Sequence, residues 1–69
     1  WNIERLAVID RNILRIAVFE MTEMPDIPHE VSINEAVELA KIFSTDKAAS
    51  FINAILDNIS KDLKKQGEE

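Results

Sequence analysis

The helix-breaking residues of this 69-residue chain are few and lie in two places. Both prolines, Pro25 and Pro28, fall within one short stretch, and the single glycine, Gly67, stands near the end. Because proline disfavours helix at the residue before it, a helix that approaches this stretch must end near Met24. No segment alternates apolar and polar residues in the way that a half-buried strand does. These features predict an all-α fold, a small helical bundle with one main break.

The apolar pattern before the prolines predicts a helix from about Arg11 to Glu23, with Asp10 as its N-cap. The apolar residues of this segment cover most of its circumference, which is typical of a central, nearly buried helix. Before it, the residues from Ile3 to Val8 are expected to form a short helical turn.

After the prolines, Ser32 and Glu35 have the spacing of a capping box, in which each side chain binds the backbone amide of the other residue. This pattern predicts a second helix that begins at Ser32 and runs to about Phe43. The alternative start is Pro28, since proline suits the first position of a helix. The apolar residues expected to face the core are Ile33, Ala36, Val37, Ala40 and Phe43.

A third helix is predicted from about Asp46 to Lys65, with Thr45 as its N-cap. The acidic residue at its start and the lysines near its end match the helix dipole. Gly67 is expected to stop it, so residues 1–66 form one helical bundle and residues 67–69 a disordered tail. The apolar residues of this helix recur at steps of four, three and four, as a narrow core-facing seam. They are Ile52, Leu56, Ile59 and Leu63, widened by Phe51 and Ile55.

Composition excludes several classes of protein. Hydrophobic residues make up 46% of the chain and charged residues 30%, which is typical of a globular rather than a disordered chain. The absence of cysteine excludes disulfides and thiolate metal sites, and no apolar stretch approaches the ~20 residues that cross a bilayer. Since no signal peptide pattern is visible, we expect a soluble cytoplasmic protein without membrane contact.

Trp1 stands where a natural start would have Met, so we expect a longer precursor or an engineered fragment.

The residue types that carry catalysis or bind metals are too few to build a site. His29 is the only histidine, and Asp26 three residues before it cannot complete a zinc site alone. A solvated loop histidine is the expected outcome. No serine has a histidine partner at helical spacing, and one glycine cannot form a phosphate-binding loop. We therefore expect no catalytic residues, no metal and no cofactor, and a protein that is not an enzyme.

A candidate RNA-binding site lies at the start of the third predicted helix. Phe51 stands close to Lys47 and Ser50 in the sequence. An aromatic ring and a cation at the surface suit base stacking combined with phosphate contact. The alternative is that Phe51 packs in the core against the helix Arg11–Glu23. The net charge of −5 opposes binding to a polyanion, so RNA binding requires a local patch or a basic partner.

Three stretches share their order and spacing with one protein family. They are DRNILRIAVFE at residues 10–20, IP at 27–28 followed by INEAVELAK at 33–41, and FINAILD at 51–57. Together they resemble the C-terminal half of the NusB family of bacterial transcription antitermination factors, from Trp1 to about Ser60. The same fold also occurs as an RNA-binding domain attached to RNA cytosine methyltransferases, which is an alternative identity for this segment.

The resemblance implies an all-α protein of two small bundles, of which this chain matches only the second. Family members bind the boxA element of RNA together with the ribosomal protein NusE. The pair acts in the antitermination complex of RNA polymerase and helps it to read through terminators in ribosomal RNA operons. Phe51 matches the RNA-facing phenylalanine of the family, and Lys47 falls at a nearby surface position. Ala54 departs from the pattern, because the family usually has glycine after Asn53.

The resemblance also bears on how this half-molecule behaves. Four polar residues match the family pattern and are expected to join the helices in a polar network, with NusE contact as the alternative: Arg15, Glu20, Asn34 and Glu35. A chain without the first bundle exposes surface that normally faces it, so self-association or a low melting point is expected. The remaining hypothesis is a helical bundle that binds only other proteins.

Overall fold

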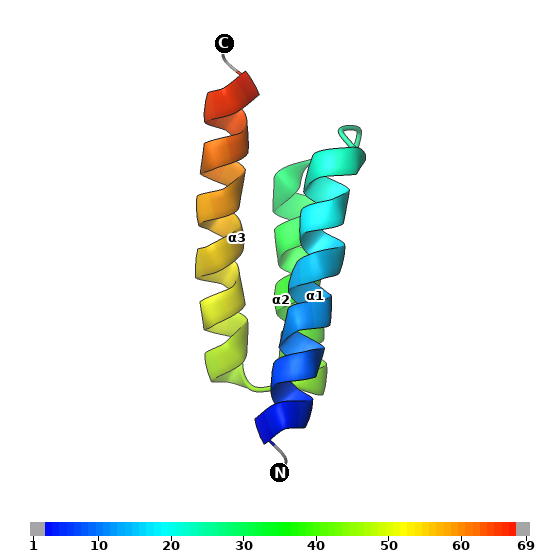
Figure 1. The fold of residues 1–69 in the computed structure, drawn as a ribbon, viewed down its shortest axis with the longest axis vertical. Coiled ribbons are helices and arrows are strands. Elements are labelled where there is room, and N and C mark those ends of the chain that lie inside the picture. The colour runs from blue at the N-terminus through cyan, green and yellow to red at the C-terminus, as the bar shows by residue number, and fades with distance from the viewer. Residues whose placement is uncertain (1–2, 68–69) are drawn as a thin grey trace.

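A computed structural model describes the backbone of residues 3–67 and the side chains of residues 7–66. It contains three helices, α1 (Ile3–Glu23), α2 (His29–Phe43) and α3 (Asp46–Gly67), and no strand among the described residues. The helices run up, down and up beside one another, so that the start of α1 and the end of α3 lie at opposite ends of the bundle (Figure 1). The bundle is elongated, with extents of 45 × 18 × 16 Å. The predicted all-α bundle of three main helices is confirmed.

Helix α1 is longer than predicted. It begins at Ile3, so the expected short turn is continuous with the main helix and Asp10 lies inside it rather than at its start. The residues before Asp10 include no glycine or proline, and good helix formers such as leucine, alanine, glutamate and arginine outweigh the capping preference of one aspartate. The end at Glu23 agrees with the prediction. There the amide of Met24 donates to the carbonyl of Glu20 at 3.1 Å, and proline follows.

Helix α2 begins at His29, three residues before the predicted capping box. Pro28 occupies the N-cap position with φ −59° and ψ 141°, and no side chain caps the helix. The amide of Val31 donates to the carbonyl of Pro28 at 3.0 Å. Ser32 lies inside the helix, is 1% exposed, and its hydroxyl has no hydrogen-bond partner. The capping-box prediction was therefore wrong, because the proline-restricted backbone already leads into the helix a turn earlier.

Helix α3 begins at the predicted residue. The Thr45 hydroxyl accepts a hydrogen bond from the Ala48 amide at 2.9 Å, which confirms Thr45 as the N-cap. The helix ends at Gly67, slightly beyond the predicted Lys65, and the rest of the predicted tail lies outside the described residues. Asp46 in the first turn and lysines in the last turn suit the helix dipole as expected.

The core lies along the centre of the three helices. Its buried side chains are Ile13, Ala17, Met21, Ala36, Ala40, Ala49, Ile52 and Leu56, and those partly buried against them are Ile9, Leu14, Val18, Ile33, Val37, Ile59 and Leu63. The predicted seam of Ile52, Leu56, Ile59 and Leu63 is thereby confirmed, but its extension by Phe51 and Ile55 does not belong to the core. Alanines at half of the buried positions let the helix backbones approach closely. Because few large side chains are buried, the core is thin, as expected for a domain of this size.

Two expectations about burial were wrong. Helix α1 is not buried all round, since Ile16 is 55% and Phe19 58% exposed. Phe43 was expected in the core and is 57% exposed. Two neighbouring helices can cover only part of the surface of α1. Because apolar side chains surround this helix, those on its uncovered side are exposed to solvent. None of the helices in the described part of the chain has the length and apolar character needed to cross a membrane.

Candidate functional site

The three predicted RNA-binding residues lie together on the surface of α3. Phe51 is 65% exposed, and Lys47 and Ser50 are also exposed. On a helix, residues three and four positions apart are neighbours, so Lys47 has both Ser50 and Phe51 beside it on the next turn. The next residue, Ile52, is fully buried, which shows that the core takes the adjacent face of the helix. Phe51 therefore does not pack into the core in this chain.

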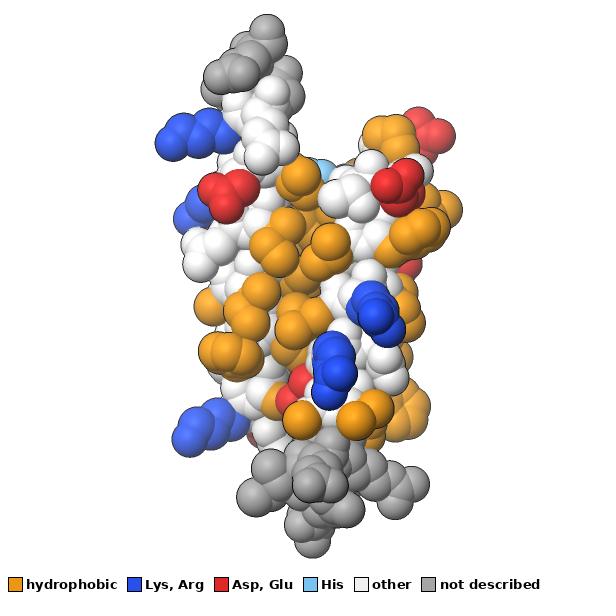
Figure 2. All heavy atoms as spheres, in the orientation of Figure 1, with side chains coloured by type: hydrophobic (Ala, Val, Ile, Leu, Met, Phe, Trp, Pro, Cys, Tyr) orange, Lys and Arg blue, Asp and Glu red, His pale blue; other side chains and the backbone are white. Residues whose placement is uncertain are grey.

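A groove runs between α1 and α3 on the side to which Phe51 belongs. It has a volume of about 460 Å³ and is lined by Arg11, Leu14, Arg15, Val18, Ile55 and Ile59. Figure 2 shows hydrophobic side chains along the junction of α3 and α1, with basic side chains beside them on α1. Ile55 follows Phe51 by one helical turn, so the groove and the exposed ring are continuous along α3.

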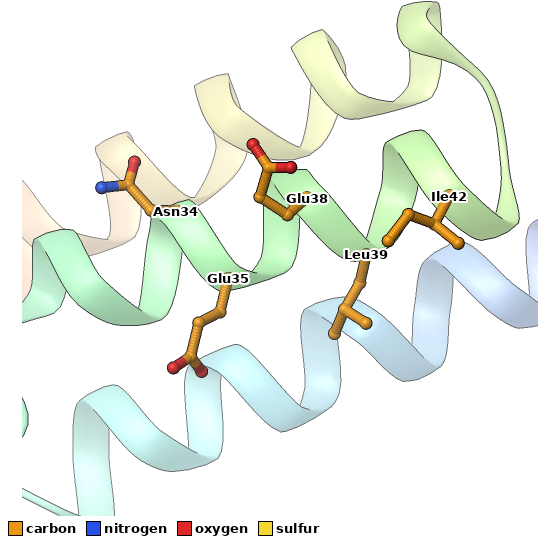
Figure 3. Close-up of a pocket in the computed structure, with 5 residues that line it drawn as sticks. All are labelled: Asn34, Glu35, Glu38, Leu39 and Ile42. Carbon is orange, nitrogen blue, oxygen red and sulfur yellow. The ribbon is translucent and has the colours of Figure 1, made fainter.

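A second hollow, of about 430 Å³, lies on the outer side of α2. All five of its residues come from that helix, and they combine apolar and acidic side chains: Asn34, Glu35, Glu38, Leu39 and Ile42. Figure 3 shows Glu35 and Leu39 pointing toward α1, where both also line a much smaller cavity of about 20 Å³ between the two helices. Ile42 is 69% exposed. This hollow carries carboxylates and no cation.

The polar network that the family resemblance implied does not form among the described residues. Arg15 lines the groove between α1 and α3, whereas Asn34 and Glu35 line the hollow on α2. Glu20 borders the small cavity between α1 and α2. No hydrogen bond or ion pair joins any two of these four side chains.

His29 is not the solvated loop histidine that the sequence predicted. It is the first residue of α2, is partly buried, and its Nδ1 lies 2.7 Å from the Ser60 hydroxyl of α3. Sequence analysis overlooked Ser60, although it follows Leu56 by one turn and so places a polar residue in the phase of the core. Asp26 is exposed in the preceding turn. Across the described residues, no three histidine, cysteine, aspartate or glutamate side chains gather closely enough to hold a metal.

Charged side chains on the described surface differ in whether they form ion pairs. Within the described part of the chain, one ion pair forms, between Lys61 and Asp57 of α3 at 3.2 Å. Both partners are well exposed, so the pair adds little to stability, but it offsets the charge of this lysine. Arg11, Arg15 and Lys47 take part in no such pair and remain available to an anion. Sequence analysis did not propose the two arginines as binding residues, although their spacing of four on one helix places them side by side.

Comparison with known proteins gives a consistent result. The model of the NusB family matches residues 1–61. A transcription antitermination protein NusB from Bacillus pumilus is 54% identical over 66 residues, which are 96% of this chain and 50% of that protein. The NusB protein of Thermodesulfovibrio yellowstonii is 56% identical over 62 residues, 90% of this chain and 41% of that protein. That of Chloroherpeton thalassium is 49% identical over 67 residues, 97% of this chain and 32% of that protein.

These relatives are named as antitermination proteins and not as enzymes. The chain spans half or less of the length of each of them. No solved structure matches the chain. The family match covers most of the sequence, including the three stretches that carry the resemblance and all but the last turns of α3. The chain belongs to the NusB family.

Proposed function

We propose that this chain is a segment of a transcription antitermination protein that binds the boxA element of RNA together with the ribosomal protein NusE, and that it contributes part of the RNA contact. The observation that carries this proposal is the exposed Phe51 ring beside Lys47 on the surface of α3. The names of the relatives support the antitermination role. Such a role places the protein in the cytoplasm, within the antitermination complex of RNA polymerase.

The residues on α3 have complementary chemistry for a single strand of RNA. An exposed aromatic ring offers a face on which a base can stack, and stacking is tolerant of sequence. The Lys47 ammonium attracts phosphate, and the Ser50 hydroxyl can donate to a phosphate or base oxygen. The net charge of −5 repels RNA from most of the remaining surface, so a basic partner such as NusE is expected to strengthen binding.

The alanine that departs from the family pattern lies on the outside of α3. Ala54 is exposed on α3, so its methyl group replaces the usual glycine without a clash inside the bundle. Alanine also favours helix over glycine by about 1 kcal/mol. We expect α3 to be stiffer at this position than in relatives with glycine, with the orientation of Phe51 correspondingly better defined.

A second candidate function is protein binding by the opposite side of the bundle. Leu39 and Ile42 are exposed in the hollow on α2, beside Glu35 and Glu38. Exposed apolar side chains bordered by carboxylates suit a protein with apolar and basic residues rather than RNA. This surface would serve a helical bundle that binds only other proteins.

A mobility-shift experiment separates the two functions. The full-length protein that contains this segment is titrated into labelled boxA RNA, with and without NusE, and a scrambled RNA of equal length serves as the control. We expect a boxA-specific complex that tightens when NusE is added, and weak binding by the 69 residues alone. Binding of NusE without any boxA preference would contradict the RNA proposal and favour the protein-binding bundle.

A further inference from the structure

The groove between α1 and α3 extends the exposed ring of Phe51 into a longer surface. We propose that a single strand of RNA continues from Phe51 along this groove, and that Arg11 and Arg15 of α1 hold its phosphates. This inference rests on the proposed RNA binding and adds to it a second helix, two binding residues and a path for the strand.

The two arginines are placed as a pair. They are four residues apart on α1, so their side chains leave the same face on successive turns. Both are exposed, and both line the groove. Neither forms an ion pair with a described acidic side chain. Two guanidinium groups at the rim of an apolar groove attract an anion that also has an apolar part.

The groove and the site on α3 form one continuous strip. Lys47, Phe51, Ile55 and Ile59 follow one another at intervals of four residues, so they lie along the same side of α3. With a rise of 1.5 Å per residue, this row is about 18 Å long. Arg11 and Arg15 line the groove opposite its last two members. A strand that stacks a base on Phe51 therefore reaches both arginines without leaving the surface.

The chemistry of the strip matches single-stranded RNA better than an acidic peptide. The floor of the groove is made of Leu14, Val18, Ile55 and Ile59, which offer apolar contact to unstacked bases. The planar guanidinium of arginine binds phosphate through two parallel hydrogen bonds and also stacks on bases. Phe51 adds an aromatic face, which an acidic peptide does not require. In a chain with a net charge of −5, this concentration of cations is complementary to a polyanion.

One acidic residue, Asp62, marks a limit of the proposed path. Asp62 follows Ile59 by three residues and is exposed on the same side of α3. Its carboxylate repels phosphate, so the strand is expected to leave the groove before this point. On α1, Asp10 directly precedes Arg11. Asp10 is partly buried, and one of its carboxylate oxygens is shielded from solvent.

The test measures RNA affinity at several salt concentrations. Fluorescence anisotropy with labelled boxA RNA is recorded for the full-length protein containing this segment, with Arg11→Gln, Arg15→Gln and the double variant. Each single variant is expected to weaken binding about three- to tenfold and to flatten the salt slope by about 0.7, the value for one phosphate contact on a single strand. Arg15→Lys, which keeps the charge, should retain the slope.

The control is Lys41→Gln, which removes the same charge from an exposed position on α2, a helix that contributes nothing to this groove. It should change neither affinity nor slope. The inference is overturned if Phe51→Ala loses RNA affinity while both arginine variants bind normally, a result that leaves the proposed function standing. It is also overturned if the arginine variants lose NusE binding instead, or lose RNA affinity with an unchanged slope. If the unaltered protein does not bind boxA RNA, the proposed function fails and this inference with it.

Discussion

Two large hollows among the described residues, the groove between α1 and α3 and the hollow on α2, differ in charge much more than in shape. The groove between α1 and α3 measures about 460 Å³ and the hollow on α2 about 430 Å³, and both have apolar floors. The groove is bordered by Arg11 and Arg15, whereas the hollow is bordered by Glu35 and Glu38. Apolar contact alone would suit many ligands. The charge at the rim therefore selects the ligand, directing a polyanion to the groove and a basic or neutral partner to the hollow.

Exposed apolar side chains indicate where copies of the chain are expected to associate. Ile16 and Phe19 on α1 are more than half exposed, as are Ile42 and Phe43 on α2. Ile16 borders the small cavity between these helices, whose rim includes Leu39. Exposed apolar side chains of this size favour association, and like charges near the arginine groove oppose it there. We expect copies of the chain to associate through the side formed by α1 and α2.

The largest expected effect is the loss of folding stability when a side chain of the core that supports both hollows is truncated. Leu56 is fully buried on α3, so Leu56→Ala should cost about 2–5 kcal/mol through lost contacts and the cavity left behind. A bundle of this size has only ~3–5 kcal/mol of core stability. Circular dichroism at 25 °C should therefore show a largely unfolded chain. Asn58→Ala, at an exposed position two residues away, is the control and should remain folded. A cooperative melt of Leu56→Ala at the original temperature would contradict this core.

The next effect distinguishes the two surfaces by their ligands. Phe51→Ala should weaken boxA binding about tenfold or more, since stacking contributes roughly 1–3 kcal/mol per base. Its urea midpoint should hardly move, because the ring is 65% exposed. Ile42→Ala removes an equally exposed apolar side chain from the acidic hollow and should leave RNA affinity unchanged. Equal losses in both variants would mean that the charge at the rim does not select the RNA surface.

Sequence patterns predicted the fold well because its causes are local. The proline break, the Thr45 cap and the spacing of the seam on α3 all act within a few residues, and the structure confirms each of them. The errors about His29 and about exposed apolar residues concern properties that depend on neighbours far along the chain, whereas the starts of α1 and α2 were misplaced because competing local signals were weighed wrongly. The contact between His29 and Ser60 joins residues 31 positions apart, and no pattern within a few residues of either one predicts it.

The candidate site was only partly predictable for the same reason. Lys47, Ser50 and Phe51 are close in sequence, so their proximity follows from the helix repeat. The groove requires α1 to lie beside α3, and only the packing of the bundle brings Arg11 and Arg15 opposite Ile55 and Ile59. Whether an apolar residue faces core or solvent also depends on how many helices surround it. The number of surrounding helices cannot be predicted from the spacing of apolar residues, which is why Phe43 was wrongly expected in the core.

A smaller effect is expected at the start of α3, which carries both the ring and the lysine of the RNA surface. Thr45→Ala removes the acceptor for the Ala48 amide and should lower the free energy of unfolding by about 1 kcal/mol. Urea denaturation measures the shift, and Thr45→Ser, which keeps the hydroxyl, should lose less. RNA affinity should fall only slightly, because Phe51 lies more than one turn into the helix. An unchanged midpoint in Thr45→Ala would show that the cap contributes nothing.

The smallest expected effect concerns Ser32, on the side of α2 that faces α1. A capping residue would lose about 1 kcal/mol on replacement by alanine. In the structure, however, the Ser32 side chain is buried with an unpaired hydroxyl, and burying a hydroxyl without a partner is unfavourable. Ser32→Ala removes that cost and improves helix propensity, so the free energy of unfolding should stay unchanged or rise by up to about 1 kcal/mol. The urea midpoint, compared with that of Thr45→Ala, measures the difference between a true cap and a core serine. A fall in the midpoint as large as that of Thr45→Ala would restore the capping box and place the start of α2 at Ser32.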